Sequence, residues 1–468
     1  MKLALPKGRL LSDTAALLQR AGLGLSDYDE GSRSYRPKST TFVDLFLKVF
    51  QEKDIPIQVA IGNYDLGICG LDWVEELLVK YPSGDLVKVG ELGYGKSDLY
   101  LVASRYVGVS SVGEIEDGFG TVRIVSEYQN LAESFALRLR LRRFKILPIW
   151  GAAEVYPPES ADLAIIAEAS VDRLADHDLV PLARILTSRA FLIANRKSLA
   201  KADMSMLLGH LSPSEVEIEE ESPLPAVTGR VFEKAAEGEK MVRFALPDGH
   251  QQRPTMEFFR KAGLKIDGYS EVLETRRPTL ELNGVTVKVI RPQDMPLQVA
   301  NGNFDLAITG KDWLKDHLYR FPSSPVEEIL DLGFGRVTIV AVVSEDLPVN
   351  NVAELRDLVR GGLLPTIRVA SEYVNIADKY ARDKHLERYK IIPTWGASEA
   401  FLPEDADLLI ENTETGETLT KHKLKIIGTL FDSSACLISN RNALSDPLKK
   451  ERVKHIIKIM EKTAKEGF

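Results

Sequence analysis

The chain repeats itself once, and this duplication constrains its fold more than any motif does. The segment IPIQVAIGNYDLGICGLDW at residues 55–73 returns as MPLQVANGNFDLAITGKDW at residues 295–313, with 12 of 19 positions identical. Shorter pairs, SEYQNLA with SEYVNIA and IWGAAE with TWGASE, follow in the same order at an offset of 245 residues, against 240 for the longer segment. Solenoid repeats have about 20–50 residues. We therefore interpret the longer unit as a complete folded module that has been copied.

The composition is typical of a globular protein. The 468 residues carry 60 Lys and Arg against 68 Asp and Glu, a net charge of −8, and 44% of them are hydrophobic. These values exclude a disordered, collagen-like or small disulfide-rich chain, and the acidic balance argues against nucleic-acid binding. Cys69 and Cys436 have no CxxC pattern or neighbouring His, so we expect no metal or redox role for them.

We expect a cytoplasmic protein without a membrane span. No run of about 18 apolar residues occurs in the chain. Near the N-terminus, Lys7 and Arg9 come too early for the apolar core of a signal peptide to form.

Within each unit, short apolar runs typical of buried strands alternate with helical patterns. VRIV precedes SEYQNLAESFALRLRLRR, and TIRVA precedes SEYVNIADKYARDKH. This alternation predicts α/β units with largely parallel sheets. The polar and acidic stretch SPSEVEIEEESPLP predicts a solvated linker between the units, and apolar residues at helical spacing predict an amphipathic helix over 446–463.

Residues 90–97, GELGYGKS, fit the GxxxxGK[ST] pattern of a nucleotide-binding P-loop. A P-loop must join a strand to a helix, because the helix N-terminus binds the phosphates. Here the strand-like run DLYLVAS follows, and the corresponding stretch of the second unit, DLGFGRVTIVAVV, lacks Lys-Ser. We therefore interpret this segment as a Gly-rich connection between two strands.

The basic turn Pro6-Lys7-Gly8-Arg9 lies between an apolar run and a helical pattern. Two cations and a glycine at a strand-to-helix turn can surround one anion, and a solvated basic turn explains the same residues equally well. The second unit has Pro247-Asp248-Gly249-His250 at this place, so we expect the anion site to be lost there.

A second candidate anion site is ENTETGETL at residues 411–419, directly after the apolar run DADLLI. Thr hydroxyls and backbone amides after a buried strand can converge on a phosphate, and Gly allows close backbone approach. Carboxylates just upstream can hold ribose hydroxyls or a Mg²⁺ ion that accompanies a polyphosphate. A helix start with a capping box is the structural alternative. The first unit has IAEASVDR here and keeps none of these groups.

Together these segments resemble the catalytic chain of the ATP phosphoribosyltransferase family, which opens histidine biosynthesis. The chain begins LALPKGRL, where the family has LA-[IL]-PKGRL. In the second unit, VKVIRPQDMP has an Arg before D-M-P, as the family has before D-[IV]-P, and FDLAITG supplies Asp305 and Gly310 of the following D-[IL]-G-x-x-G element. GASE matches the family's G-[SA]-x-E element. ENTETGETL matches D-x-x-x-TG-x-TL, with Glu411 in place of the usual Asp.

The resemblance implies an α/β fold like that of a type II periplasmic binding protein, with two lobes around a cleft in each unit. The chain would then be a fused pair of short-form catalytic chains. The implied boundaries are 1–211 for the first unit, with lobes at 1–103 plus 188–211 and at 104–187; 212–239 for the linker; and 240–468 for the second unit, with lobes at 240–345 plus 433–468 and at 346–432.

The resemblance also implies the substrates, the cofactor and the site residues. In the family reaction, N1 of ATP attacks C1 of the ribose of phosphoribosyl diphosphate while pyrophosphate leaves. This needs positioning and electrostatic stabilisation more than a strong base. Mg²⁺ is the implied cofactor, without assigned protein ligands. The implied residues are Lys7, Arg9 and Arg291 as catalytic cations; Glu411, Thr413, Glu414, Thr415, Gly416, Glu417, Thr418 and Glu399 for phosphoribosyl diphosphate; and Arg36, Arg277, Asp305 and Gly310 for ATP.

The two units have lost complementary groups. The first keeps Lys7 and Arg9 but lacks the Thr-rich loop and has Gln51 where the second has Arg291. Family members are dimeric, so we hypothesise one composite active site per chain, in which the second unit binds phosphoribosyl diphosphate and Lys7, Arg9 and Arg36 act from the first. A homo-oligomer or a regulatory partner subunit is also implied. The alternative is a catalytically inactive ligand-binding or regulatory subunit of the same pathway, because the fold supports binding alone.

Overall fold

The computed structural model describes residues 1–32, 34–82, 84–115, 119–201, 203–211, 241–270, 272, 275–442 and 446–466. In this part of the chain, none of the helices combines the length and the apolar character that crossing a membrane requires. The predicted linker at 212–239 lies outside the described residues.

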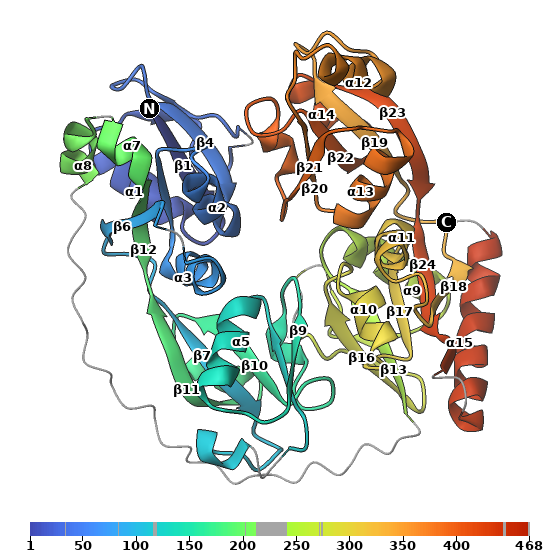
Figure 1. The fold of residues 1–468 in the computed structure, drawn as a ribbon. Helices are drawn as coiled ribbons and strands as arrows, with labels where there is room; N and C mark the ends of the chain where they lie inside the picture. The colour runs from blue at the N-terminus through green and yellow to red at the C-terminus, as the bar shows by residue number, and fades with distance from the viewer. Residues whose placement is uncertain are drawn as a thin grey trace. The chain divides into compact units, whose positions relative to one another are not determined.

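The chain divides into two compact units, in agreement with the tandem repeat (Figure 1). Unit 1 contains most of the first repeat, and unit 2 contains most of the second. Each unit also includes one short segment of the other repeat, which the sequence did not indicate. The bounds are Met1–Ile149, Tyr156–Glu233 and Trp395–Ala400 for unit 1, and Trp150–Val155, Lys234–Thr394 and Phe401–Phe468 for unit 2.

The first lobe of unit 1 is built on a five-stranded sheet in the order β4-β1-β5-β12-β6. β1 is parallel to β4 and β5, whereas β12 is antiparallel to β5 and β6. The bounds are β1 Lys2–Lys7, α1 Leu11–Arg20, β2 Leu25–Ser26, β3 Lys38–Ser39, β4 Phe46–Gln51, η1 Glu52–Asp54, α2 Ile55–Ala60, β5 Leu66–Gly70, α3 Leu71–Lys80, β6 Leu86–Glu91, β12 Ala190–Asn195, α7 Arg196–Lys201 and α8 Ser205–Leu211.

The second lobe of unit 1 has a sheet of the same size in the order β11-β7-β10-β8-β9. β8 is parallel to β9 and β10, and β7 is antiparallel to β10 and β11. The bounds are β7 Ser97–Ser104, η2 Val112–Glu114, β8 Val122–Ser126, α5 Gln129–Arg138, β9 Phe144–Pro148, β10 Leu163–Glu168, α6 Asp172–Asp176 and β11 Leu179–Ser188.

Unit 2 repeats both sheets, in the orders β16-β13-β17-β24-β18 and β21-β20-β22-β19-β23. The bounds in its first lobe are β13 Val242–Pro247, η4 Gly249–Gln251, α9 Gln252–Lys261, β14 Ile266–Asp267, β15 Thr279–Leu280, β16 Val285–Ile290, α10 Met295–Ala300, β17 Leu306–Gly310, α11 Lys311–Arg320, β18 Val326–Asp331, β24 Ala435–Asn440 and α15 Pro447–Glu466. Those in its second lobe are β19 Val337–Ser344, α12 Val352–Arg360, β20 Ile367–Ser371, α13 Val374–Asp383, β21 Tyr389–Pro393, β22 Leu408–Thr413, α14 Glu417–Lys421 and β23 Leu424–Ser433.

These topologies confirm the predicted fold class of two tandem α/β units with two lobes each, and they correct two details. Each sheet is mixed rather than largely parallel, because the strands by which the chain crosses between the lobes pair antiparallel to their neighbours. The first crossing also comes earlier than predicted. β7 and β19 belong to the second sheets, so the predicted lobe end at residue 103 lies within β7 and the one at residue 345 lies just after β19, instead of before these strands.

The P-loop-like segment at residues 90–97 is the crossing itself, as the interpretation of a strand-to-strand connection predicted. It joins β6 of the first sheet to β7 of the second. Tyr94 anchors it through a hydrogen bond of 2.7 Å to the Thr14 hydroxyl on α1. Gly95 has a φ of +69°, and a Cβ atom there would collide with Leu10. The glycines therefore serve a tight connection and not a phosphate cradle.

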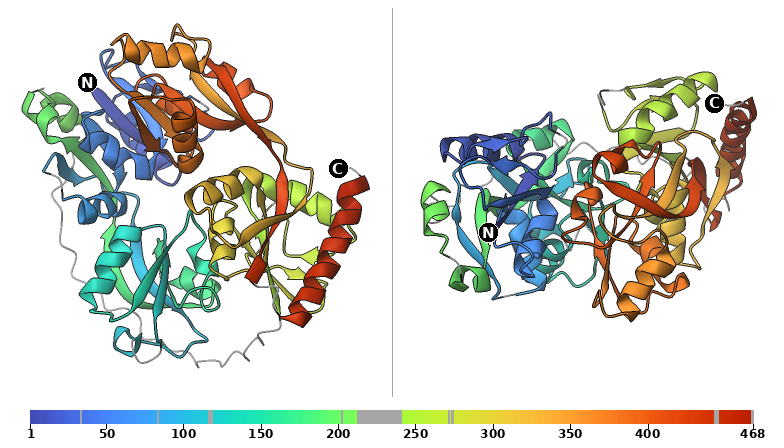
Figure 2. Two further views of the ribbon diagram at one scale, coloured as in Figure 1. Left: turned by 45° about the vertical axis from the view of Figure 1, so that its right-hand side comes forward. Right: turned by 90° about the horizontal axis from the view of Figure 1, so that it is seen from above.

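The predicted C-terminal helix is α15, which covers the first lobe of unit 2 (Figure 2). Asp446 accepts hydrogen bonds from the backbone amides of Leu448 and Lys449, which caps the helix start. Val453 and Met460 are fully buried in a core that also contains Phe244 and Leu306. The apolar face of the helix is therefore a structural element of this lobe.

Candidate functional site

The Thr-rich loop of unit 2 follows β22 directly and has a defined shape. Gly416 adopts a φ of +78°, a left-handed conformation that favours glycine, and α14 begins at the next residue. The Thr413 hydroxyl accepts a hydrogen bond of 2.9 Å from the Gly416 amide. Leu419 is buried and anchors the turn, whereas Thr415 and Thr418 are exposed. The loop therefore presents hydroxyls to solvent around a glycine turn.

The capping box that we considered as the alternative is not formed. The residue that caps α14 is Gly416, which has no side chain to accept a hydrogen bond. The Thr415 hydroxyl instead accepts from the Glu417 amide at 3.4 Å. The two Thr hydroxyls thus accept hydrogen bonds from backbone amides that can also donate to a bound phosphate.

The corresponding place in unit 1 has the same strand and short helix but a different turn. Val171, which takes the place of Gly416, has a helical φ of −62°. The Ser170 hydroxyl accepts from the Asp172 amide, and Glu168 pairs with Arg173 at 4.0 Å. Unit 1 therefore lacks both the threonines and the left-handed turn of the loop.

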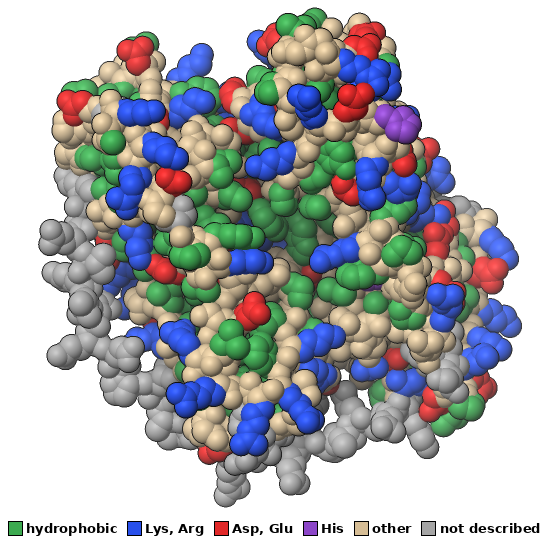
Figure 3. All heavy atoms as spheres, in the orientation of Figure 1, with side chains coloured by type: hydrophobic (Ala, Val, Ile, Leu, Met, Phe, Trp, Pro, Cys, Tyr) green, Lys and Arg blue, Asp and Glu red, His purple; other side chains and the backbone are tan. Residues whose placement is uncertain are grey.

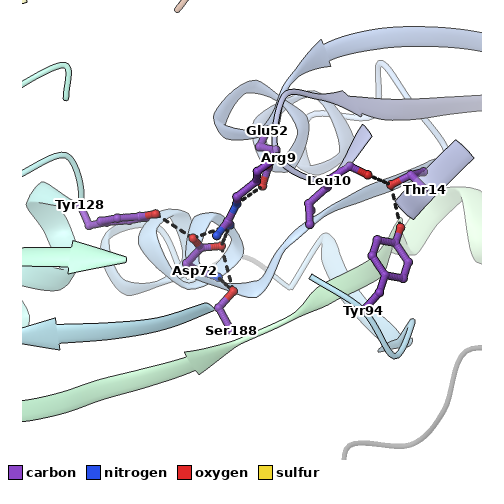
Figure 4. Close-up of polar contacts among 8 residues, drawn as sticks. All are labelled: Arg9, Leu10, Thr14, Glu52, Asp72, Tyr94, Tyr128 and Ser188. Carbon is purple, nitrogen blue, oxygen red and sulfur yellow. Dashed lines mark hydrogen bonds and ion pairs between the residues drawn. The ribbon is translucent and has the colours of Figure 1, made fainter. Parts of the chain in front are cut away.

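Arg9, a predicted phosphate ligand of unit 1, is held by two carboxylates (Figure 4). Its Nε donates to Glu52 at 3.1 Å, and its Nη2 donates to both oxygens of Asp72 at 2.7 and 2.9 Å. Tyr128 and Ser188 also donate to Asp72, at 2.7 and 3.0 Å. Burial lowers the pKa of Arg9, but the two carboxylates more than offset this effect, so the net shift is upward. The ion pairs thus occupy Nε and Nη2, while 35% of the Arg9 side chain stays exposed.

The sequence reasoning missed Glu52 and Asp72. They lie 43 and 63 residues after Arg9 in the chain. Pairing at such separations depends on the order of the strands, which the motif alone did not contain.

The two other predicted cations of unit 1 have different surroundings. The Lys7 ammonium lies 5.1 Å from the centre of the Tyr35 ring and has no ion-pair partner among the described residues. Arg36 donates a long hydrogen bond of 3.5 Å to the Ala400 carbonyl. Ala400 belongs to the short segment, Trp395–Ala400, that unit 1 takes from the second repeat. This segment also contains Glu399, which is half-buried.

Arg291, the predicted cation of unit 2, is paired with Asp248 at 3.1 Å. Asp248 replaces Lys7 of unit 1, and it also pairs with Arg276 at 3.0 Å. Arg276 in turn contacts Glu154 at 2.7 Å. An acidic residue thus neutralises the arginines at the carboxyl ends of the parallel strands β13 and β16, where ligands of α/β sheets commonly bind.

Arg277 of unit 2 binds the short segment Trp150–Val155, which comes from the first repeat. Arg277 and the buried Lys288 donate to the Val155 carbonyl at 3.2 and 2.8 Å. The Trp150 amide donates to both carboxylate oxygens of Asp294 at 3.0 Å. A predicted ATP contact is therefore used to hold the protein chain.

The last two predicted ATP contacts have clear structural roles. Asp305 is buried, accepts from the Arg243 amide at 2.8 Å and contacts the Lys449 ammonium at 3.2 Å. Gly310 ends β17, and a Cβ atom at this position would collide with the Asp312 carboxylate. Neither observation tests ATP binding, which stays a prediction for both residues.

Unit 1 has a cavity of about 670 Å³ that is separate from the predicted site residues. Its lining includes Ile57, Ile61, Tyr81, Asn195 and Lys197, and none of the predicted site residues. On the face drawn in Figure 3, Lys and Arg side chains are dispersed among acidic and apolar ones. The coloured basic side chains of this face therefore form no single broad patch.

The fold and the loop together define a class: a duplicated, two-lobed α/β protein whose second copy carries a phosphate-loop-like turn. The profile of the HisG family, described as ATP phosphoribosyltransferase, matches residues 51–212 and 291–462, which is more than half of the chain. The chain therefore belongs to the ATP phosphoribosyltransferase family, a family of pentosyltransferases of histidine biosynthesis, as the resemblance predicted.

Individual relatives agree with this assignment. An ATP phosphoribosyltransferase of Methanocaldococcus jannaschii is 34% identical over 219 residues, which are 46% of this chain and 71% of the relative. One of Prosthecochloris aestuarii is 30% identical over 227 residues, 47% of this chain and 71% of the relative.

Solved structures are more distant. The ATP phosphoribosyl transferase (HisG:HisZ) complex from Thermotoga maritima has a TM-score of 0.38 at 20% identity, covering 48% of this chain and 100% of that one. The alkanesulfonate-binding protein SsuA from Xanthomonas axonopodis pv. citri has a TM-score of 0.30 at 10% identity, covering 48% of this chain and 73% of that one.

Proposed function

We propose that the chain transfers the 5-phosphoribosyl group from phosphoribosyl diphosphate to N1 of ATP and releases pyrophosphate. The observation that carries this proposal is the loop after β22, in which Gly416 turns at a φ of +78° between threonines in a member of this family. Unit 1 has a helical valine at the same place. We infer that the loop of unit 2 is the phosphoribosyl-diphosphate site.

Different residues of the loop bind different parts of phosphoribosyl diphosphate. The hydroxyls and amides from Thr413 to Thr418 bind the 5-phosphate, and Glu411 and Glu414 bind the ribose hydroxyls. Glu399 stays a predicted contact of the same substrate. N1 of ATP already carries a lone pair, so the residues need only orient the two substrates and stabilise the departing pyrophosphate.

Cations must balance the charge of the leaving pyrophosphate. Arg291 in unit 2 and Lys7, Arg9 and Arg36 in unit 1 are the proposed groups, and the complementary losses of the two repeats support one composite site per chain. Asp248 competes with a phosphate for Arg291, and Glu52 and Asp72 compete with it for Arg9. Lys7 has no such competitor among the described residues, which makes it the cation most available to a substrate.

We expect Mg²⁺ to reach the loop bound to the phosphates of the substrate. Among the described residues, no group of three or more His, Cys, Asp or Glu side chains is arranged to hold a metal. Mg²⁺ commonly binds through substrate phosphates, water and only one or two carboxylates, so it needs no protein site of three or more such side chains. When bound, the ion would neutralise phosphate charge on the leaving group.

The proposal is tested by incubating the purified chain with ATP, phosphoribosyl diphosphate and Mg²⁺ and measuring phosphoribosyl-ATP. Thr415→Ala should lower product formation strongly, because it removes a loop hydroxyl. Ser170→Ala removes a hydroxyl at the matching place in unit 1 and should have no effect. The reverse result would exclude the loop of unit 2 as the site.

A second candidate function is a catalytically inactive ligand-binding or regulatory subunit of the same pathway. The ion pairs of Arg9 and Arg291 favour it, because both cations are neutralised by the protein itself. Absence of product, both alone and with a regulatory partner subunit, would support this candidate. The need for such a partner, self-association and the cytoplasmic location stay predictions.

A further inference from the structure

The residue that follows Glu411 connects the proposed sugar-binding carboxylate to the rest of unit 2. The backbone amide of Asn412 donates to Glu411 Oε1 at 3.0 Å, and its side-chain amide donates to the same oxygen at 3.1 Å. The side-chain amide also donates to the Tyr373 hydroxyl at 3.0 Å. One amide group therefore binds the carboxylate and the phenol together.

Tyr373 continues this connection into the first lobe. Its hydroxyl donates to Asp312 Oδ2 at 2.6 Å, and its side chain is almost completely buried. Asp312 also accepts from the Ser433 hydroxyl at 3.0 Å. Trp313 packs on the Tyr373 ring with the two ring centres 4.4 Å apart.

The connected residues lie on different elements of the two lobes. Asp312 is at the start of α11 in the first lobe, Tyr373 precedes α13 in the second, and Asn412 is near the end of β22. A continuous chain of hydrogen bonds thus runs from the first lobe to the loop. Such buried networks hold their members in one arrangement when each donor has an acceptor.

Unit 1 has the same chain of hydrogen bonds but lacks a residue equivalent to Asn412. Tyr128 donates to Asp72 Oδ2 at 2.7 Å, and Trp73 packs on its ring at 4.4 Å, as in unit 2. The residue that matches Asn412 is Ala167, which has no amide side chain. The contact between the tyrosine and the strand end therefore occurs only in the unit that carries the loop.

We propose that Asn412 and Tyr373 are positioning residues that hold the Glu411 carboxylate in the orientation required by the ribose hydroxyls of phosphoribosyl diphosphate. This inference rests on the proposed function of the loop. Neither residue is assigned a contact with substrate. Asn412 acts on Glu411, and Tyr373 acts on Asn412 while fixing the loop to the first lobe.

In this proposal, Glu411 binds the ribose hydroxyls equally in the substrate complex and in the transition state. Loss of its orientation should therefore weaken binding more than it slows the chemical step. We expect the KM for phosphoribosyl diphosphate to rise about tenfold in Asn412→Leu, which has a similar size but no amide, and kcat to change by less than about twofold. In Tyr373→Phe we expect a KM increase of about three- to tenfold.

Tyr128→Phe is the matched control, because it removes the equivalent bond to the equivalent aspartate in unit 1. Both tyrosine variants should lower the melting temperature by similar amounts, but only Tyr373→Phe should raise the KM. Equal KM values in Tyr373→Phe, Asn412→Leu and the wild type would overturn the proposal. Equal KM increases in the two tyrosine variants would overturn it as well, because they would indicate a general loss of stability.

Equilibrium binding separates this inference from the proposed function. Titration of the full chain with phosphoribosyl diphosphate and Mg²⁺ in a calorimeter should give an affinity about tenfold lower for Asn412→Leu. If the wild type does not bind the compound, the proposed function fails. If the wild type and Asn412→Leu bind it equally well, the function stands and the positioning role is wrong.

Discussion

Glu52 is a residue whose charge state the fold controls. Its side chain is 8% exposed, and burial raises its pKa to about 7, although Arg9 acts against this shift. An acid with a higher pKa in the folded state binds protons more tightly when folded than when unfolded. We therefore expect its contribution to the free energy of unfolding to fall as the pH rises from 4.5 to about 7 and to stay level above that.

Glu52→Gln tests this expectation, because glutamine keeps the shape of the side chain but does not titrate. Thermal unfolding between about pH 5 and 8 should show a smaller loss of stability with rising pH in the variant. Burial also raises the pKa of Glu76 to about 7, but Glu76 titrates in both proteins, so the difference between them reports Glu52. Identical pH profiles would contradict the expectation.

Asp248 controls the charge available on Arg291. In Asp248→Asn, both Arg291 and Arg276 lose their ion pair with this carboxylate, so the strand ends of unit 2 become more basic. We expect inorganic pyrophosphate to bind about three- to tenfold more tightly, with a stronger dependence on salt. Asp331→Asn makes the same change of charge beside Lys311 and should not alter binding. Unchanged pyrophosphate affinity in Asp248→Asn would exclude Arg291 as an anion ligand.

The Thr-rich loop is the element on which function depends most directly, and its shape rests on Gly416. A Cβ atom there would meet no other atom within 4 Å, so Gly416→Ala adds only the cost of a left-handed backbone, about 1–2 kcal/mol. We expect a small loss of stability and a large loss of phosphoribosyl-diphosphate binding, because alanine favours a helical turn like that of Val171 in unit 1. Calorimetric titration and thermal unfolding measure the two effects.

Gly263→Ala is the control for this element. Gly263 has a φ of +70° and equally open space, but it follows α9 and not the loop. Its replacement should cost similar stability and leave binding unchanged. Equal binding by the wild type and Gly416→Ala would contradict the role of the turn.

The elements themselves were largely predictable from local pattern. The alternation of apolar runs with helical periods predicted α/β units, and the missing helix after residue 97 identified the P-loop-like segment as a connection. The sheet to which β7 belongs was not predictable, because its apolar run fits either lobe equally well. The exchange of Trp150–Val155 and Trp395–Ala400 was also missed, since no local pattern indicates which unit a short loop packs in.

The candidate site was predictable only where its residues are contiguous. The loop after β22 combines strand, threonines and glycine within nine residues, so its sequence alone indicated a phosphate site. The partners of Arg9 and Arg291 come from distant segments, and both arginines were therefore predicted as open cations. Asn412 was overlooked inside the motif because its contact with Tyr373 spans 39 residues.

At the scale of the whole molecule, the duplication predicts how many substrates bind. Two intact copies would bind two molecules of phosphoribosyl diphosphate per chain, but unit 1 has lost the loop residues and the left-handed turn. We expect calorimetry with Mg²⁺ to give one site per 468-residue chain. Two equivalent sites would show that unit 1 binds the substrate by other residues.

Lys7 tests whether unit 1 contributes to that single site. The residue is suited to this test because it has no ion-pair partner among the described residues and loses only its cation–π contact with Tyr35, so Lys7→Ala should lower the melting temperature only slightly. Arg9→Ala is a poorer test, since it leaves the Glu52 and Asp72 carboxylates without their cation and should destabilise unit 1. If Lys7 binds a phosphate of either substrate, Lys7→Ala should lower kcat/KM about tenfold or more while the stoichiometry stays at one. Unchanged kcat and unchanged KM for both substrates would instead mean that unit 2 carries the whole site and that the basic turn of unit 1 is a solvated surface turn.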